Sequence, residues 1–81
     1  MAKKAKRRVN SFDQHIAARL LAKRKELGRS QTDVANAIGV TFQQVQKYES
    51  ATNRISAGRL WQLAGYFKVP VTYFFEGLRQ S

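Results

Sequence analysis

The sequence contains no cysteine, a single histidine and only five acidic residues in 81. Without cysteine, the chain can form neither a disulfide nor a thiolate metal site. The lone histidine, His15, is expected on a solvated helix face, and no phosphate-binding glycine loop is present. The acids provide neither the paired carboxylates of acid–base catalysis nor the spacing of metal ligands. They lie at Asp13, Glu26, Asp33, Glu49 and Glu76. We therefore predict a protein that is not an enzyme and that binds no metal and no cofactor.

The sequence also lacks a long apolar run. No stretch approaches the roughly 20 apolar residues of a transmembrane helix. The charged N-terminus is not followed by the apolar segment of a secretory signal. These absences favour a cytoplasmic protein without a membrane partner. The 81 residues fit one small domain, with no room for a second, ligand-sensing domain.

Positive charge is abundant. Fifteen lysine and arginine residues give a formal net charge of +10 and a pI near 10.8. This excess indicates a polyanionic partner, either nucleic acid or an acidic membrane surface. A second interpretation is that the charge only keeps a small protein soluble.

The N-terminal residues 1–10 form a basic leader that offers almost nothing to bury and is expected to be disordered alone. Its cationic side chains are Lys3, Lys4, Lys6, Arg7 and Arg8. Two interpretations are open, because a charge run is evidence of composition only. The leader is either an arm that closes on a phosphate backbone or enters a groove, or a solvated tail. We expect the ordered domain to span residues 11–79.

Helical periodicity and cap residues predict an all-α fold of five short helices, without strands. The first helix begins at Ser11, where Ser11 and Gln14 form a capping box, and ends at Gly28. Its apolar face is predicted to include Leu20 and Leu27. The second helix is capped by Ser30, with Asp33 three residues on, and runs to about Ile38. The third helix is predicted to be capped by Thr41 and to end near Glu49 or Ser50. The fourth helix is capped by Ser56, and the fifth begins with Pro70 in its first turn and ends at Gly77.

The stretch from Gln31 to Tyr48 has the spacing of a helix-turn-helix. Ala35 is small where the two helices must approach closely, and Gly39 can adopt the positive φ that redirects the chain. An apolar inner face is formed by Val34, Ile38, Val40, Val45 and Tyr48. The second helix is then left with a polar outer face able to enter a DNA major groove.

Aromatic residues are concentrated near the C-terminus. Six of the nine lie between residues 61 and 75, at Trp61, Tyr66, Phe67, Tyr73, Phe74 and Phe75. Such residues either complete the core or form a symmetric dimer patch. We assign Trp61 and Phe67 to the core, and Val71, Tyr73 and Phe74 to a dimer interface.

Several motifs together suggest a family. They are R-K-E-L-G-R-S-Q at 24–31, A-x-x-x-G at 35–39, Y-E at 48–49 and L-A-G-Y-F-K-V-P at 63–70. With them, the chain resembles the Cro/phage-repressor-like (xenobiotic-response-element type) helix-turn-helix family of bacterial transcription factors over about residues 12–78. The phrases F-Q-Q-V-Q-K-Y-E, N-R-I-S and V-T-Y-F-F resemble an alphaproteobacterial branch. Two positions depart from the family pattern: Ile55 stands where many members have proline, and Arg29 where an apolar residue is common.

The resemblance implies an internal ion pair between Arg24 on the first helix and Glu49 at the end of the third. Such a pair would tie the two helices together and aim Arg24 at a phosphate. The alternative is two unrelated surface charges, which contribute little to stability.

The third helix is the predicted reader of DNA bases. Its candidate base-reading residues are Thr41, Phe42, Gln43, Gln46 and Lys47. Gln43 can bond both edge groups of an adenine, and Lys47 can donate to guanine or to a phosphate. Phe42 either contacts thymine methyl groups or folds back onto the core.

Phosphate contacts are expected from both flanks of this helix. The candidates are Ser30, Gln31, Arg24, Ser50, Asn53 and Arg54. For Asn53 and Arg54, ordinary turn chemistry is the alternative.

These features predict a sequence-specific transcriptional regulator that binds double-stranded DNA in the bacterial cytoplasm, associated with the nucleoid. We expect a homodimer on a near-palindromic operator. Two alternatives remain: an antitoxin-like interaction module with an unknown protein partner, and a sequence-neutral nucleoid protein.

Overall fold

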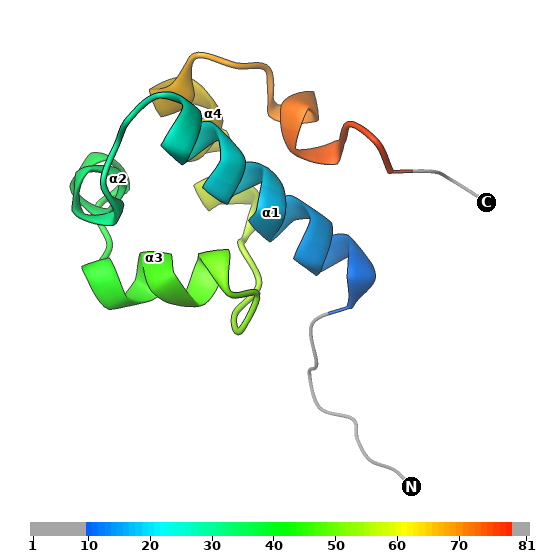
Figure 1. The fold of residues 1–81 in the computed structure, drawn as a ribbon, viewed down its shortest axis with the longest axis horizontal. Helices are drawn as coiled ribbons and strands as arrows, with labels where there is room; N and C mark the ends of the chain where they lie inside the picture. Colours follow the sequence, from blue (N-terminus) through cyan, green and yellow to red (C-terminus); the bar gives the residue numbers. More distant parts are fainter. Residues whose placement is uncertain (1–9, 79–81) are drawn as a thin grey trace, which may run out of the picture.

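Short helices make up the part of the chain that the structure, a computed structural model, describes: residues 10–78 (Figure 1). They are α1 (Ser11–Glu26), α2 (Gln31–Ile38), α3 (Phe42–Glu49), α4 (Ala57–Phe67) and the 3₁₀ helix η2 (Val71–Phe75). The all-α prediction is confirmed for this part of the chain, which contains four α-helices and no strand. The basic leader falls largely outside the described residues, and so does the end of the predicted domain at residue 79.

The prediction of a fifth α-helix is wrong. Residues 71–75 form a 3₁₀ turn, in which the N–H of Tyr73 donates to the carbonyl of Pro70 at 2.9 Å. Pro70 stands before this element, in an extended conformation, rather than in its first turn. The segment is only five residues long and opens with the β-branched pair Val71 and Thr72, so a 3₁₀ turn is favoured over a short α-helix.

Each α-helix begins with a side-chain cap. The oxygens of Ser30, Thr41 and Ser56 each accept a hydrogen bond from the N–H three residues later, as the sequence predicts. The cap of α1 lies one residue earlier than predicted. Asn10, not Ser11, is the N-cap, and Asn10 and Asp13 form a reciprocal capping box with both bonds at 3.0 Å. Asparagine is as good a cap as serine, and the shorter Asp13 side chain replaces the expected glutamine.

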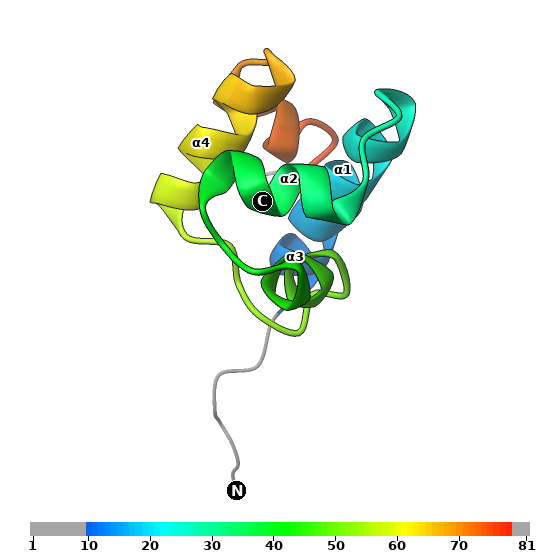
Figure 2. The ribbon, with the colours of Figure 1, turned by 90° about the vertical axis from the view of Figure 1, so that its left-hand side faces the viewer.

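The turn between α2 and α3 is made by a glycine, as expected. Gly39 has φ +75° and its N–H donates to the carbonyl of Ala35 at 2.9 Å. Ala35 is 2% exposed, so the small side chain lies where the helices meet. In Figure 1 α2 is seen end-on and α3 side-on, and the reverse holds in Figure 2. Their axes therefore cross steeply, as in a helix-turn-helix.

The core lies between all five elements. The α2 helix packs on α3 and α4, α1 packs on α3 and η2, and α4 packs on η2. The fully buried large side chains are Leu20, Val34, Ile38, Val45, Leu63 and Phe74. No helix within residues 10–78 combines the length and the apolar character needed to cross a membrane.

Three apolar residues lie where the sequence did not predict them. Leu27 is 42% exposed and is the C-cap residue of α1, directly after the last helical residue Glu26. Trp61 is 73% exposed, whereas Phe67 is buried as predicted. Phe74 is completely buried, so it belongs to the core and not to a dimer interface.

Candidate nucleic-acid interface

The α3 helix has one buried face and one exposed face. Val45 is fully buried and Tyr48 is 7% exposed, which fixes the inward side of this helix. The exposed face carries four of the residues predicted to read bases: Phe42, Gln43, Gln46 and Lys47. With a 3.6-residue period, this arrangement presents an aromatic ring, two amides and one ammonium group on the outside of α3. Phe42 is 40% exposed and therefore does not fold back into the core.

Thr41 lies at the N-terminus of α3 and has a structural task. Its hydroxyl oxygen accepts a hydrogen bond from the N–H of Gln44 at 3.1 Å. Ser30 does the same for α2, where its Oγ accepts from the N–H of Asp33 at 2.9 Å. Both hydroxyls are exposed caps, so their oxygens lie at helix starts that also present backbone N–H groups.

Arg24 of α1 and Glu49 of α3 form a two-pronged ion pair. The Nε of Arg24 donates to Oε2 of Glu49 at 2.6 Å, and Nη2 donates to Oε1 at 3.1 Å. The side chains are 13% and 6% exposed. Gln31 adds a third bond, from its Nε2 to Oε1 of Glu49 at 2.9 Å. This network joins α1, α2 and the end of α3 through one carboxylate.

This network engages the side chains of two residues predicted to bind phosphate, Arg24 and Gln31. The third guanidinium donor of Arg24, Nη1, bonds the carbonyl of Arg29 at 2.9 Å, so Arg24 holds α3 and the α1–α2 turn in position. Gln31 likewise directs its side-chain amide to Glu49, inward rather than toward solvent. The electrostatic consequence concerns α3. Its one acidic residue, Glu49, is covered and neutralised, so the exposed face of the helix carries only the positive charge of Lys47.

The loop after α3 contains the other phosphate candidates. Ser50 and Asn53 are exposed, and the N–H of Asn53 donates to the carbonyl of Lys47 at 3.2 Å. The Nε of Arg54 donates to Oδ2 of Asp13 at 2.9 Å, which links the loop to the start of α1. Arg54 is 57% exposed at its side chain, so this link leaves much of the residue on the surface.

Every acidic residue of the chain is engaged. Asp13, Glu26, Glu49 and Glu76 each pair with a basic side chain, at 2.6–3.0 Å. Asp33 instead accepts a hydrogen bond from the N–H of Ser30 at 2.8 Å. Hydrogen bonds from the backbone N–H of Ser30, and then from its side chain, lower the pKa of Asp33, and the charge of Arg29 adds to the effect. Negative charge is therefore locally neutralised, and the net charge of +10 is left to act on the surroundings.

Among residues 10–78, no group of three or more His, Cys, Asp or Glu side chains is arranged to hold a metal ion. The interface instead combines an exposed polar helix face, two capped helix starts and a polar loop, a set of groups suited to binding an extended polar surface.

A helix-turn-helix family model matches residues 20–74, which include α2, α3 and α4 completely. The chain belongs to the Cro/repressor-like helix-turn-helix family. The expected resemblance is thereby confirmed, and the matched segment contains the Arg24–Glu49 pair and the whole exposed face of α3.

Similar proteins in alphaproteobacteria are described as transcriptional regulators. The chain is 47% identical over 75 residues to an uncharacterized HTH-type transcriptional regulator of Sinorhizobium fredii, covering 93% of this chain and 52% of that protein. It is 43% identical to an uncharacterized transcriptional regulator in the ATPase CF(0) region of Rhodospirillum rubrum, covering 93% and 69%. The chain thus spans about half the length of the first of these relatives.

Solved structures share the fold. The restriction-modification controller protein C.AhdI from Aeromonas hydrophila superposes with a TM-score of 0.76, at 21% identity, over 82% of this chain and all of that chain. The clp gene regulator ClgR from C. glutamicum gives a TM-score of 0.76 at 17% identity, over 82% and 86% of the two chains. At identities of 21% and 17%, the likeness shows that this helix-turn-helix protein shares the fold of these structures.

Sequence reasoning missed two features of the molecular surface, one beside α3 and one on α4. The Asp13–Arg54 bond joins residues 41 positions apart and has no local signal. The exposure of Trp61 did have a local signal in the sequence. Three and four residues from it, on the same side of α4, lie Gly58 and Gly65, and neither contributes a side chain to a core. The buried face is formed instead by Leu60, Leu63, Ala64 and Phe67.

Proposed function

We propose that this protein is a sequence-specific DNA-binding transcriptional regulator whose α3 helix enters the major groove. One observation carries the proposal. The exposed face of α3 presents Gln43, Gln46 and Lys47, while the only carboxylate of the helix, on Glu49, is covered by Arg24 and Gln31. A helix face with amide and ammonium groups and no exposed negative charge is suited to base edges lined by phosphates.

Base recognition would depend on side chains near the start of α3. Gln43 offers one amide donor and one acceptor, which match the N7 and N6 groups of adenine. Lys47, one helical turn further on, donates to guanine or to a phosphate. Phe42, exposed beside them, would contact the thymine methyl group.

Phosphate contacts would flank this helix. The start of α2 supplies the backbone N–H of Gln31 and the positive end of a helix dipole, while the N–H of Ser30 is bonded to Asp33. On the other side, the exposed Ser50 and Asn53 and the partly exposed Arg54 would meet the backbone of the neighbouring turn. Arg24 would act indirectly, by fixing α3 relative to α1.

Two copies are needed for a site of useful length, since one recognition helix contacts only a few base pairs. We propose a homodimer on a near-palindromic operator, with half-sites about 10 bp apart. The relatives described as transcriptional regulators support the regulatory part of the proposed function.

The test is selection from a randomised DNA pool at about 0.15 M salt, where electrostatic binding alone is weakened. Sequencing of the retained DNA should give an enriched near-palindrome. Retention that depends on salt but enriches no sequence would contradict the proposal and identify a sequence-neutral nucleoid protein. Unselective, weak retention would favour an interaction module with a protein partner.

A further inference from the structure

The C-terminal end of α2 is bonded by a side chain from another helix. The Nη1 of Arg59, in the first turn of α4, donates to the carbonyl of Ile38 at 2.8 Å. Ile38 is the last residue of α2, so no N–H within that helix can donate to its carbonyl. Figure 2 shows this end of α2 beside the start of α4, where the chain turns toward α3. Arg59 therefore caps α2 from outside the helix.

The charge of Arg59 is placed unfavourably for α4 and favourably for α2. The backbone N–H of Arg59 donates to Oγ of Ser56, the N-cap of α4, at 3.2 Å, so the residue lies at the positive end of its own helix dipole. The α2 helix has no basic residue in its last turn. A guanidinium group at the Ile38 carbonyl supplies the positive charge that this helix end lacks. The position of the arginine is thus explained by α2 and not by α4.

A second bond directs the guanidinium group toward α2. Nη1 of Arg59 also donates to Oε1 of Gln62, one turn further along α4, at 2.8 Å. One nitrogen therefore makes both bonds, with one hydrogen for each. Arg59 is partly buried, whereas Gln62 is exposed. The side chain is held in its direction by its own helix and makes its contact with the neighbouring one.

The carbonyl of Ile38 belongs to the peptide that enters the turn between α2 and α3. The next residue, Gly39, has φ +75°, and only Gly39, Val40 and Thr41 separate the two helices. A group bonded to this peptide constrains the direction in which α3 begins. We propose that Arg59 is a positioning residue for base reading, because it fixes the start of α3 through the Ile38 carbonyl.

With Arg59, polar contacts fix the α3 helix at both ends. At its last residue, Glu49 is bonded to Arg24 of α1 and to Gln31 of α2. Arg59 adds a contact from α4 before the first residue of α3. Loss of this contact would let the whole helix shift, and all of its exposed side chains would move together. The inference rests on the proposed function, since it concerns the helix that would read DNA.

A specificity profile separates positioning from stability. Affinities of the wild type and Arg59→Met are measured for the selected DNA site and all its single-base-pair variants. Discrimination should fall by about threefold or more at several positions of each half-site in Arg59→Met, because the bonds of several side chains to bases are misaligned together. A merely structural role would lower the folded fraction and weaken all sequences alike. Unchanged discrimination in a folded Arg59→Met variant would overturn the inference.

Arg19→Met is the matched control. Arg19 also bonds a backbone carbonyl of another element, from its Nε to Tyr73 at 2.9 Å, and the substitution removes the same charge. It bonds Glu76 as well, so the partners of Arg19 lie in η2 and directly after it, not at the turn before α3. This variant should lose stability and overall affinity but keep the discrimination of the wild type. Equal losses of discrimination in Arg19→Met and Arg59→Met would overturn the inference.

Arg59→Lys provides the rescue. Because one nitrogen makes both bonds, an ammonium group can replace it, and this variant should keep most of the discrimination. A lysine variant as unselective as Arg59→Met would overturn the assignment to the Ile38 carbonyl. Thermal unfolding verifies that each variant folds. Should Arg59→Met not fold, Arg59→Gln takes its place, since the amide nitrogen of glutamine lies two bonds nearer the backbone than Nη1.

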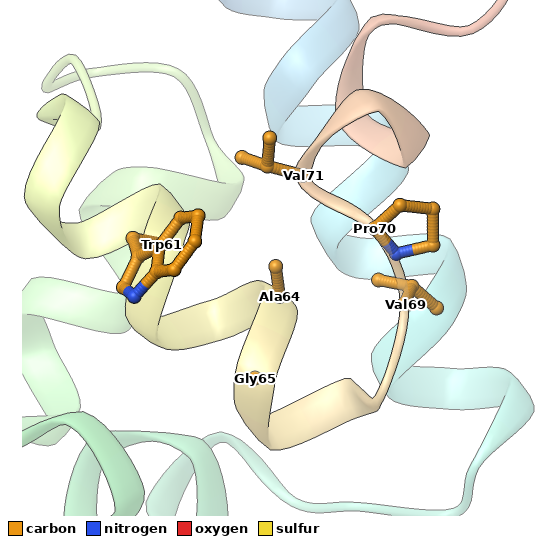
Figure 3. Close-up of a pocket in the computed structure, with 6 residues that line it drawn as sticks. All are labelled: Trp61, Ala64, Gly65, Val69, Pro70 and Val71. Atoms are coloured by element: carbon orange, nitrogen blue, oxygen red, sulfur yellow. The ribbon is translucent and has the colours of Figure 1, made fainter.

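These substitutions leave another side of α4 intact. Trp61 follows Arg59 by two residues, which places the two side chains on nearly opposite sides of the helix. Beside the indole lies an open hollow of about 230 Å³, lined by Trp61, Ala64, Gly65, Val69, Pro70 and Val71 (Figure 3). Arg59 does not line this hollow, so its variants test the contact between α4 and α2 alone.

A measurement without DNA distinguishes failure of this inference from failure of the proposed function. Residual dipolar couplings of the backbone N–H groups report the orientation of α3 relative to α2 and α4. This orientation should change in Arg59→Met and not in Arg19→Met. If the wild type enriches no DNA sequence, the DNA-binding proposal fails, while the couplings still decide the role of Arg59. Couplings of α3 that are unchanged in Arg59→Met would overturn the inference.

Discussion

Arg24 and Glu49 face each other across the α1–α3 contact with both prongs of a guanidinium–carboxylate pair bonded, at 2.6 and 3.1 Å. The pair is nearly enclosed, and Gln31 of α2 shares the carboxylate. It therefore couples the orientation of α3 to the two helices that precede it. A bidentate pair of this kind fixes direction as well as distance, which a single hydrogen bond does not.

Removal of this carboxylate should be costly. Glu49→Ala leaves the Arg24 charge partly buried without its partner, and we expect the free energy of unfolding to fall by about 3 kcal/mol. Urea denaturation measures the change. Glu26→Ala is the control, because its pair with Lys23 is exposed at the carboxylate, and it should change stability by less than about 0.5 kcal/mol. Equal losses in both variants would contradict the role given to the Arg24–Glu49 pair.

Truncation should reduce stability far more at Phe74 than at Trp61. Phe74→Ala empties a fully buried site between η2, α1 and α4, and should cost about 3–5 kcal/mol. Trp61→Ala removes a ring that is 73% exposed in the monomer, and should cost less than about 0.5 kcal/mol when measured at a concentration where the chain is monomeric. Urea titrations of the two variants provide the comparison. A large loss for Trp61→Ala would mean that the indole packs within its own chain.

The capping box of α2 predicts a pH dependence. The hydrogen bonds from Ser30 place the folded-state pKa of Asp33 below its ordinary value of 3.8. The ionised group binds fewer protons in the folded state, so its contribution is present above pH 3.8 and is lost as the pH falls through the lowered folded-state pKa. Thermal unfolding from pH 5 down to pH 2 should therefore show a steeper loss of stability for the wild type than for Asp33→Asn. Parallel curves would show that the cap does not depend on charge.

Gly39 should tolerate no side chain without strain. Its φ of +75° lies in the left-handed region, while no atom would contact an added Cβ. The cost of Gly39→Ala is therefore conformational, and we expect about 1 kcal/mol. Gly65→Ala is the matched control, because it lies inside α4 without a positive φ and should stabilise the monomer. Chemical denaturation of both variants should give opposite signs.

The sequence predicts those parts of the fold that depend on local rules. The caps at Ser30, Thr41 and Ser56 and the glycine turn at Gly39 are local, since each needs only one residue type at one position. The cap of α1 was misplaced by one residue because Asn10 and Ser11 are equally suitable caps. The two reciprocal bonds between Asn10 and Asp13 distinguish them.

Other features depend on tertiary contacts that the sequence does not display. The burial of Phe74 follows from the packing of η2 on α1 and α4. The inward direction of the Gln31 side chain depends on Glu49, 18 residues away. Within the candidate site, the helical period alone placed Gln43, Gln46 and Lys47 on the outside of α3. The bond from Arg24 to the carbonyl of Arg29 could not be predicted from the spacing of residues in the sequence.

Base reading by Gln43 is the central claim, and a specificity profile tests it most directly. Affinities are measured for the selected DNA site and all its single-base-pair variants, with the wild type, Gln43→Ala and Arg7→Ala. Gln43→Ala should lose about 1–3 kcal/mol of discrimination at one position in each half-site and keep the other preferences. Arg7→Ala, in the basic leader, should weaken all sequences alike and lower the salt dependence. A uniform loss for Gln43→Ala, with its sequence preferences unchanged, would contradict the claim that α3 reads DNA through this residue.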